Sequence, residues 1–187
     1  MSDEELNSYD IISTYLGSGL FNRLQGSWIK IVVLRDSVNR LVSSYWHLRT
    51  NPRFVSFASG LAKSCALHEY LASREPSVIF QTTNVQAWTV LGDRSVAFRQ
   101  RYIHLSHREL CELAIERLRI YDFVGFTEHL DDLWTAICLR FGWSLSPLPR
   151  LNQTAYSNDL ALVNPKDEAF HTALGSAFVH RVLVAGR

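Results

Sequence analysis

The sequence predicts an α/β protein: a three-layer sandwich in which helices cover both faces of a mainly parallel sheet. The first observation is the segment 28–34, WIKIVVL, whose β-branched and aliphatic residues form a nearly continuous run. Such a run is typical of a parallel strand that is buried on both faces. A helical pattern follows this strand at once, and a later strand is followed by a helix in the same way. This alternation favours α/β over all-α architecture.

The helix after the 28–34 strand is predicted from apolar residues at spacings of three and four, which we expect to pack back onto the sheet. Asp36 is a suitable N-cap for this helix. Pro52 ends the pattern, and helical spacing resumes over 57–73. The apolar positions of the first helix are Val38, Leu41, Val42, Tyr45, Trp46 and Leu48.

The remaining elements are assigned in the same way. Residues 1–26 show no long helical period and are predicted to form loop and a short helix. A helix over 106–119 precedes a short buried strand over 121–126. Another helix follows over 130–141 and ends near Gly142, because glycine commonly terminates helices.

Composition indicates one globular domain over residues 1–187, since 47% of the residues are apolar and 20% are charged. The net charge of +1 gives no global field for nucleic acid or an anionic membrane. Cys65, Cys111 and Cys138 are widely spaced, which predicts buried reduced thiols and neither a disulfide framework nor a metal site. No segment reaches the roughly 18 apolar residues of a membrane span, and the acidic N-terminus differs from a signal peptide. A cytoplasmic location is therefore expected.

Arg35 and Ser43 form a candidate phosphate clamp. Arg35 stands at the C-terminal end of the 28–34 strand, the edge at which open α/β sheets bind ligands. Its guanidinium group presents a fixed fork of donors that suits phosphate. Ser43 lies two turns into the following helix, from which its hydroxyl can reach the same anion.

At these residues the chain resembles the sulfotransferases, in particular the branch of carbohydrate sulfotransferases and their bacterial relatives. That family binds a nucleotide 3′-phosphate with a hydrophobic strand ending in Arg, usually followed by Asp-Pro, and a Ser eight positions after the Arg. Here the corresponding residues are Arg35, Asp36 and Ser43, with Ser37 where proline is usual. Three more stretches match the family in order: NVQAWTVLGD from Asn84, FVGFTEHLDDLW from Phe123 and PRLNQT from Pro149.

The resemblance implies a P-loop-NTPase-like sulfotransferase fold and 3′-phosphoadenosine 5′-phosphosulfate as the nucleotide co-substrate. The implied reaction transfers sulfate to a hydroxyl of a carbohydrate-type acceptor. Arg35 and Ser43 would hold the nucleotide's 3′-phosphate, and Thr154 in the Asn-x-Thr of PRLNQT is a second phosphate candidate. An ordinary turn or N-cap hydroxyl is the alternative for Thr154. The Asn84-x-Gln86 signature would line the acceptor side, with polar loop capping as its alternative.

The chain departs from the family pattern near its start. Family members begin with a strand and a Gly/Ser/Thr-rich loop with a lysine, whose amides hold the 5′-phosphosulfate. Nothing before Trp28 matches this unit, and we expect a domain that lacks it. Thr14 and Tyr15 stand where the family has Gly and His, the candidate general base. Because an unperturbed tyrosine has a pKa of about 10, Tyr15 would be a poor base, and no catalytic residue is assigned.

Three functions follow as hypotheses. The first is an active sulfotransferase. The second is a degenerate or truncated module that binds the nucleotide without transferring sulfate. The third is a structural or partner-binding α/β domain in which Arg35 pairs with a carboxylate.

Overall fold

The fold is described from a computed structural model, for residues 2–13, 17–92 and 95–149. Before the first strand lie α1 (Asp3–Leu6) and the 3₁₀ helix η1 (Ser18–Arg23). The strands are β1 (Ile31–Leu34) and β2 (Phe123–Phe126). Between them come α2 (Ser37–Thr50), α3 (Phe57–Ser64), α4 (Leu67–Ala72), α5 (Pro76–Thr82), α6 (Val85–Leu91), α7 (Val96–Gln100), α8 (His107–Arg117) and η2 (Leu118–Ile120). The turn η3 (Thr127–His129) and α9 (Leu130–Phe141) follow β2.

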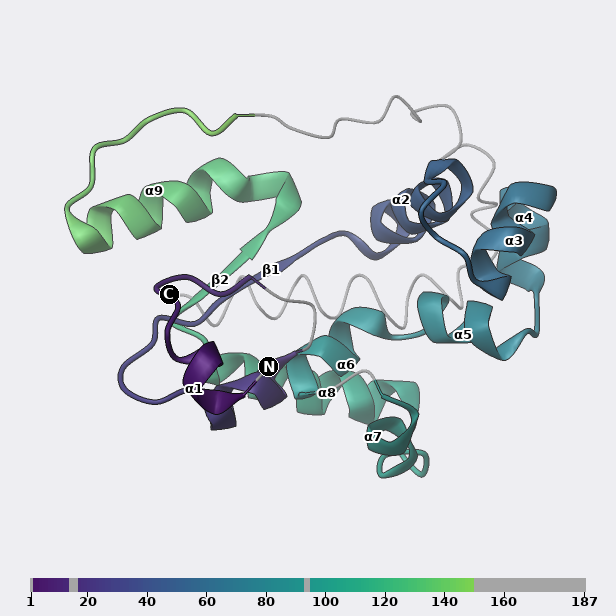
Figure 1. The fold of residues 1–187 in the computed structure, drawn as a ribbon, viewed down its shortest axis with the longest axis horizontal. Coiled ribbons are helices and arrows are strands. Elements are labelled where there is room, and N and C mark those ends of the chain that lie inside the picture. The colour runs from purple at the N-terminus through teal and green to yellow at the C-terminus, as the bar shows by residue number, and fades with distance from the viewer. Residues whose placement is uncertain (1, 14–16, 93–94, 150–187) are drawn as a thin grey trace.

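β1 and β2 pair in parallel, with Ile31 opposite Phe123 and Leu34 opposite Phe126. The two strands form the sheet within the described part of the chain. One face of this sheet packs on α6 and α8, which lie below the strands in Figure 1. The core on this side contains Val32, Leu34, Ala87, Trp88, Val90, Leu91, Leu110, Ala114, Leu118 and Phe126. The predicted α/β alternation is thus present around one parallel strand pair.

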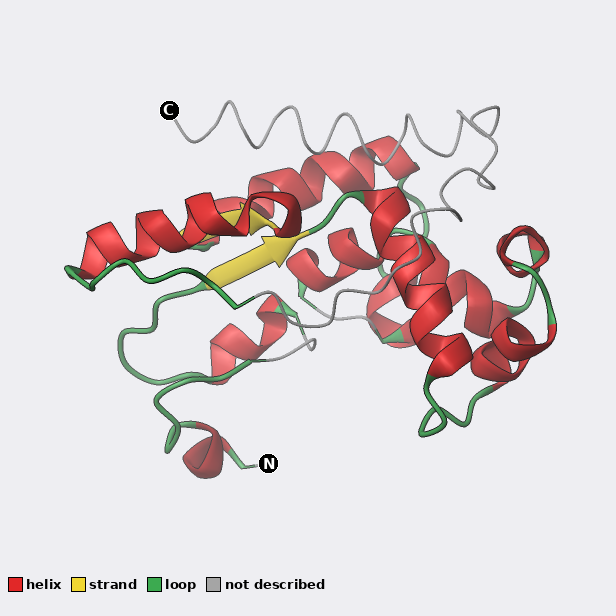
Figure 2. Cartoon of the chain, turned by 90° about the horizontal axis from the view of Figure 1, so that it is seen from above, coloured by secondary structure: helices red, strands yellow, loops and turns green. Residues whose placement is uncertain are grey.

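On the other face of the sheet, within the described residues, α9 packs against β2 and runs alongside the strands (Figure 2). On β1, Ile31 is 44% exposed and Val33 is 45% exposed. The prediction that the 28–34 strand is buried on both faces is therefore wrong, and regular pairing begins only at Ile31. The physical reason is the position of α2, which does not return to the sheet.

α2 instead joins a separate group of helices with α3, α4 and α5 (Figure 1). Its apolar face is buried as predicted, but against helices. This second core contains Val42, Tyr45, Leu48, Ala58, Ala62, Leu67, Tyr70 and Val78. The Asp36 N-cap is confirmed, since its carboxylate accepts a hydrogen bond from the Asn39 N–H at 2.9 Å. Periodicity therefore predicted which face of α2 is buried, but not what buries it.

The helix predicted over 57–73 is divided into α3 and α4. α3 ends at Cys65, whose carbonyl accepts hydrogen bonds from the Tyr45 hydroxyl at 2.7 Å and from Arg49 Nη1 at 2.8 Å. Arg49 Nη1 also donates to the Ala62 carbonyl at 2.7 Å. These donors from α2 satisfy carbonyls that a continuing helix would otherwise use, so the helix can end here.

Gly125 on β2 lies directly against Leu133 of α9. A Cβ at this position would lie 2.9 Å from Leu133 Cβ, an atom that cannot move without displacing α9. We expect Gly125→Ala to lower the free energy of unfolding by about 1–3 kcal/mol, the usual cost of overpacking. Urea denaturation measures this value. Gly60→Ala on α3 is the control, because nothing lies within 4 Å of its added Cβ. Equal stability of the two variants would contradict the described packing of α9.

Tyr70 is buried in the second core, at 1% exposure, and its hydroxyl has no hydrogen-bond partner among the described residues. Burial raises its pKa to about 12, with a further increase from Cys65 and an opposing effect from Arg40. The folded-state pKa of Tyr70 lies above the unfolded value of about 10, so folding favours the neutral phenol. The stabilisation from the neutral phenol is therefore complete below about pH 10 and is lost as the pH rises towards 12.

We therefore expect Tyr70→Phe to be neutral or stabilising at about pH 8, since it removes an unpaired buried hydroxyl. The variant should also lose less stability than the wild type between about pH 8 and about pH 11. Urea denaturation at both pH values checks this. Tyr9→Phe, at an exposed tyrosine, should follow the wild type at both. Identical pH dependence of Tyr70→Phe and the wild type would show that Tyr70 is not buried in the folded state.

Candidate functional site

Arg35 follows β1 directly, and its main chain is held on both sides by Gln86 of α6. The Arg35 N–H donates to Gln86 Oε1 at 2.8 Å, and Gln86 Nε2 donates to the Arg35 carbonyl at 2.8 Å. This reciprocal pair continues hydrogen bonding beyond the end of the sheet. It fixes the backbone from which the Arg35 side chain extends.

Glu128 of η3 joins the ends of the two strands. Its carboxylate accepts a hydrogen bond from the Asp36 N–H at 3.2 Å, while Asp36 caps α2. Both carboxylates therefore bind main-chain N–H groups at the start of α2. The N–H groups at a helix N-terminus normally attract anions. Here the two carboxylates already offset the positive end of the α2 dipole. A phosphate would have to lie beside the first turns of α2.

Ser43 lies beside those turns. It is half-buried on α2, on the face that also carries Asn39 and Arg40, because residues three and four apart are neighbours on a helix. Seven residues at 1.5 Å each place it about 10 Å along the helix axis from Asp36. Its hydroxyl makes no hydrogen bond within the described residues. One β–α connection thus carries both Arg35 and Ser43.

Arg40 is a cationic neighbour of Ser43 that the sequence analysis did not single out. Its Nη1 and Nη2 atoms lie 3.4 Å from the carbonyl oxygens of Gln81 and Thr82 at the end of α5. These are long hydrogen bonds, and the guanidinium group is only partly buried. Its spacing of three residues from Ser43 was the signal that could have identified it.

Asn84 and His107 form a polar pair beside this connection. Asn84 has left-handed backbone geometry, with a φ of 52°, and is 6% exposed. Its Nδ2 lies 2.7 Å from His107 Nδ1, and its Oδ1 has no partner in the described part of the chain. Asn84 thus connects α6 to α8, and Gln86 connects α6 to the end of β1. Both contacts resemble polar capping. The acceptor-side role of this signature stays a prediction.

We expect Gln86→Ala to destabilise the protein by about 1–3 kcal/mol, because two partly buried hydrogen bonds to the main chain of Arg35 are lost. It should also weaken any ligand contact made by Arg35. Urea denaturation measures the stability. The control is Gln100→Ala at an exposed position of α7, which should change the free energy of unfolding by no more than about 0.5 kcal/mol. A stability of Gln86→Ala equal to that of the control would contradict the role of Gln86 in fixing Arg35.

Several residues of the sequence-based hypothesis cannot be placed. Thr154 lies outside the described residues, as do Thr14 and Tyr15. Between residues 17 and 30 the structure describes η1 and irregular chain, with no strand or phosphate-binding loop in that range. Lys30 lies at the start of β1 with its ammonium group over the Phe21 ring, far from the end of the strand.

The cysteines and the wider surface add little to this site. Cys65, Cys111 and Cys138 are all free thiols. No group of histidine, cysteine and acidic residues suited to a metal ion occurs among the residues described. In the same part of the chain, no helix has the length and apolar character needed to cross a membrane.

Comparisons with protein-family models, curated proteins and solved structures found no match for this chain.

Proposed function

We propose that this protein binds 3′-phosphoadenosine 5′-phosphosulfate where β1 and β2 end, with Arg35 and Ser43 holding the 3′-phosphate. The observation that supports this most is the fixed main chain of Arg35. A parallel strand ends in an arginine whose peptide is clamped by Gln86, and a helix that carries Ser43 begins at once. Because its main chain is fixed, Arg35 pays no further backbone entropy when its side chain binds an anion.

The associated reaction is transfer of the sulfuryl group to a carbohydrate-type hydroxyl. In-line transfer needs positioning of the two reactants and cationic stabilisation of the sulfuryl oxygens. Arg35 and Ser43 would contact the 3′-phosphate and not the transferred group, so they contribute binding and not chemistry. Thr154 remains a second phosphate contact in this proposal. The three-layer sulfotransferase fold also remains part of the proposal.

A nucleotide-binding module without transferase activity is the second candidate. It is favoured by residues 17–30, which form η1 and irregular chain in place of a strand and a phosphate-binding loop. In this candidate the clamp at the end of β1 is retained, and the 5′-phosphosulfate lacks donors from that region.

A thermal-shift titration with 3′,5′-adenosine bisphosphate tests binding in both candidates. At a ligand concentration of about 100 times Kd, a single site adds about 2.7 kcal/mol of stability. For a chain of this size the Tm should rise by roughly 5–10 °C. Adenosine 5′-monophosphate, which lacks the 3′-phosphate, should give a clearly smaller shift. If neither nucleotide raises the Tm, the structural hypothesis for Arg35 replaces this proposal.

A further inference from the structure

A separate cavity of about 400 Å³ runs along β1, between this strand and the N-terminal segment that carries η1. Its size lies within the range of about 300–1,000 Å³ that is usual for small-molecule sites. Lys30 marks the end of the cavity near the start of β1. Arg35 lies five positions after Lys30, roughly 16 Å along extended chain, and is not among the residues that line the cavity, which reach Val33.

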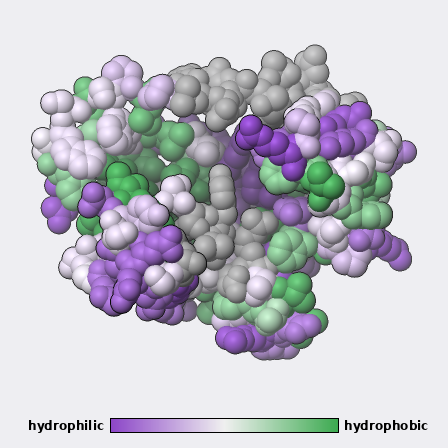
Figure 3. Space-filling view, viewed as in Figure 1, coloured by the Kyte–Doolittle hydropathy of each residue, from purple (hydrophilic) through white to green (hydrophobic). Residues whose placement is uncertain are grey.

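The cavity walls are mainly apolar. Ile31 and Val33 are half-exposed on one face of β1, and Val32 lines the cavity from the other face, together with Leu20 and Phe21 of η1. Trp28 adds an aromatic ring to the lining. In the space-filling view, hydrophobic surface is visible between α9 and the hydrophilic surface over α1 (Figure 3). The exposure of Ile31 and Val33, which the sequence did not predict, is thus surface that a ligand can cover.

The wall formed by η1 is fixed by contacts on both of its ends. At its start, the Ser18 hydroxyl donates to the Val90 carbonyl at 2.7 Å, and the Gly19 N–H donates to the Gly92 carbonyl at 2.9 Å. The cavity is therefore closed towards α6.

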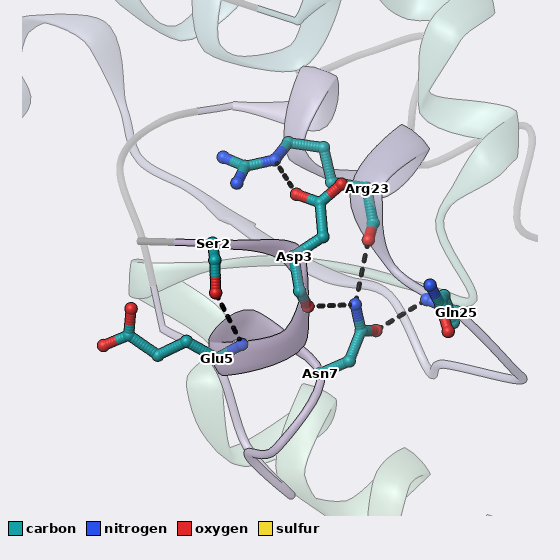
Figure 4. A network of polar contacts seen from close by, with 6 residues as sticks. All are labelled: Ser2, Asp3, Glu5, Asn7, Arg23 and Gln25. Carbon is teal, nitrogen blue, oxygen red and sulfur yellow. Dashed lines mark hydrogen bonds and ion pairs between the residues drawn. The ribbon is translucent and has the colours of Figure 1, made fainter.

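At the end of η1, the side chains of α1 hold the chain (Figure 4). Arg23 Nε donates to Asp3 Oδ1 at 2.7 Å, and Asn7 Nδ2 donates to the Arg23 carbonyl at 3.1 Å. The Gln25 N–H donates to Asn7 Oδ1 at 2.6 Å. These contacts pre-organise the cavity, which lowers the entropic cost of filling it.

Lys30 gives the cavity its charge. It is the one charged residue among the described residues that line the cavity, and its Nζ lies 5.7 Å from the centre of the Phe21 ring. The neighbouring Asp122 is not a lining residue, and its carboxylate accepts a hydrogen bond from the Lys30 N–H at 2.7 Å. Burial raises the pKa of the Tyr121 phenol in the lining. Tyr121 is therefore neutral and does not repel an anion.

We propose that this cavity binds a small amphipathic anion, with its apolar body against the apolar lining along β1 and its negative group at Lys30. An ammonium group without an acidic partner in an apolar cavity selects negative over positive ligands. This proposal goes beyond the nucleotide site and does not depend on it.

Calorimetry with octanoate, octylammonium and 1-octanol tests the proposal, since the three probes share a chain and differ in charge. Octanoate should bind most tightly. Lys30→Gln, which keeps most of the side-chain length, should weaken octanoate about tenfold, as expected for a partly exposed charge-assisted contact, and leave 1-octanol unchanged. Lys63→Gln on the exposed surface of α3 is the matched control and should change neither.

A second variant, Val33→Phe, fills the cavity from β1 and should weaken octanoate and 1-octanol alike. Circular dichroism melting of each variant verifies that it is folded, and Arg35→Ala should bind octanoate like the wild type. Octylammonium binding as tightly as octanoate would overturn the proposal, as would unchanged octanoate affinity in Lys30→Gln. It would also be overturned if a short extended apolar peptide bound while octanoate did not, because β1 would then be a strand-docking edge.

Discussion

The 187-residue chain is expected to transfer sulfate at least about a hundred- to a thousandfold more slowly than an enzyme with a complete 5′-phosphosulfate site. Removing a single preorganised donor from such a site typically costs this much in rate. Here the described residues before β1 provide neither a strand nor a loop of main-chain amides with a lysine. Under the proposed sulfotransferase function, Tyr15 would stand in place of a histidine base and add a second defect, because an unshifted phenol is rarely ionised at neutral pH.

Transfer of radiolabelled sulfate from the nucleotide donor to an oligosaccharide measures this rate. The control is the same chain with an N-terminal extension that carries a strand and a lysine-bearing phosphate loop. Restored activity in the extended protein would favour the enzyme hypothesis for the longer protein. Ordinary enzymatic rates from the 187 residues alone would show that the catalytic groups lie elsewhere in this chain.

Arg35→Ala is expected to weaken binding of 3′,5′-adenosine bisphosphate by about 1.5–3 kcal/mol, the range for a hydrogen bond to a charged group. That corresponds to a loss of affinity of roughly 10- to 150-fold. The substitution should leave the fold intact, because Gln86 binds main-chain atoms that alanine also has. Ser43→Ala should cost less, about 0.5–1.5 kcal/mol, since its hydroxyl is a neutral donor.

Two further arginine variants make this result specific. Arg53→Ala, at an exposed position after α2, removes the same charge outside the site and should bind the nucleotide like the wild type. Arg35→Lys keeps the charge but loses the planar fork of donors, so its affinity should lie between those of wild type and Arg35→Ala. Unchanged affinity of Arg35→Ala would remove Arg35 from the binding site.

Elements with strong local signals could be predicted from the sequence. Asp36 caps α2 as expected, and α8 begins with a capping box between Ser106 and Glu109. α9 ends at Gly142, whose φ of 66° lies in the left-handed region. Such signals depend on residues within a few positions of each other, so one sequence contains them in full.

Features set by distant residues could not be predicted. The partner of α2 and the exposed face of β1 depend on how helices pack, which the periodicity of 28–34 does not encode. The break between α3 and α4 depends on Arg49 reaching carbonyls more than ten positions away. At the candidate site, the sequence indicated Arg35 and Ser43 but not the clamp by Gln86, which forms across 51 residues.

The affinities of wild type and Arg35→Ala for two nucleotides, 3′,5′-adenosine bisphosphate and adenosine 5′-monophosphate, test the central claim most directly. If Arg35 holds the 3′-phosphate, the substitution should weaken the bisphosphate by about 1.5–3 kcal/mol and the monophosphate by less than about 0.5 kcal/mol. Calorimetry of both proteins with both nucleotides gives the coupling free energy between the guanidinium group and the 3′-phosphate. Equal losses for the two nucleotides, or no loss for either, would contradict a 3′-phosphate site at the end of β1.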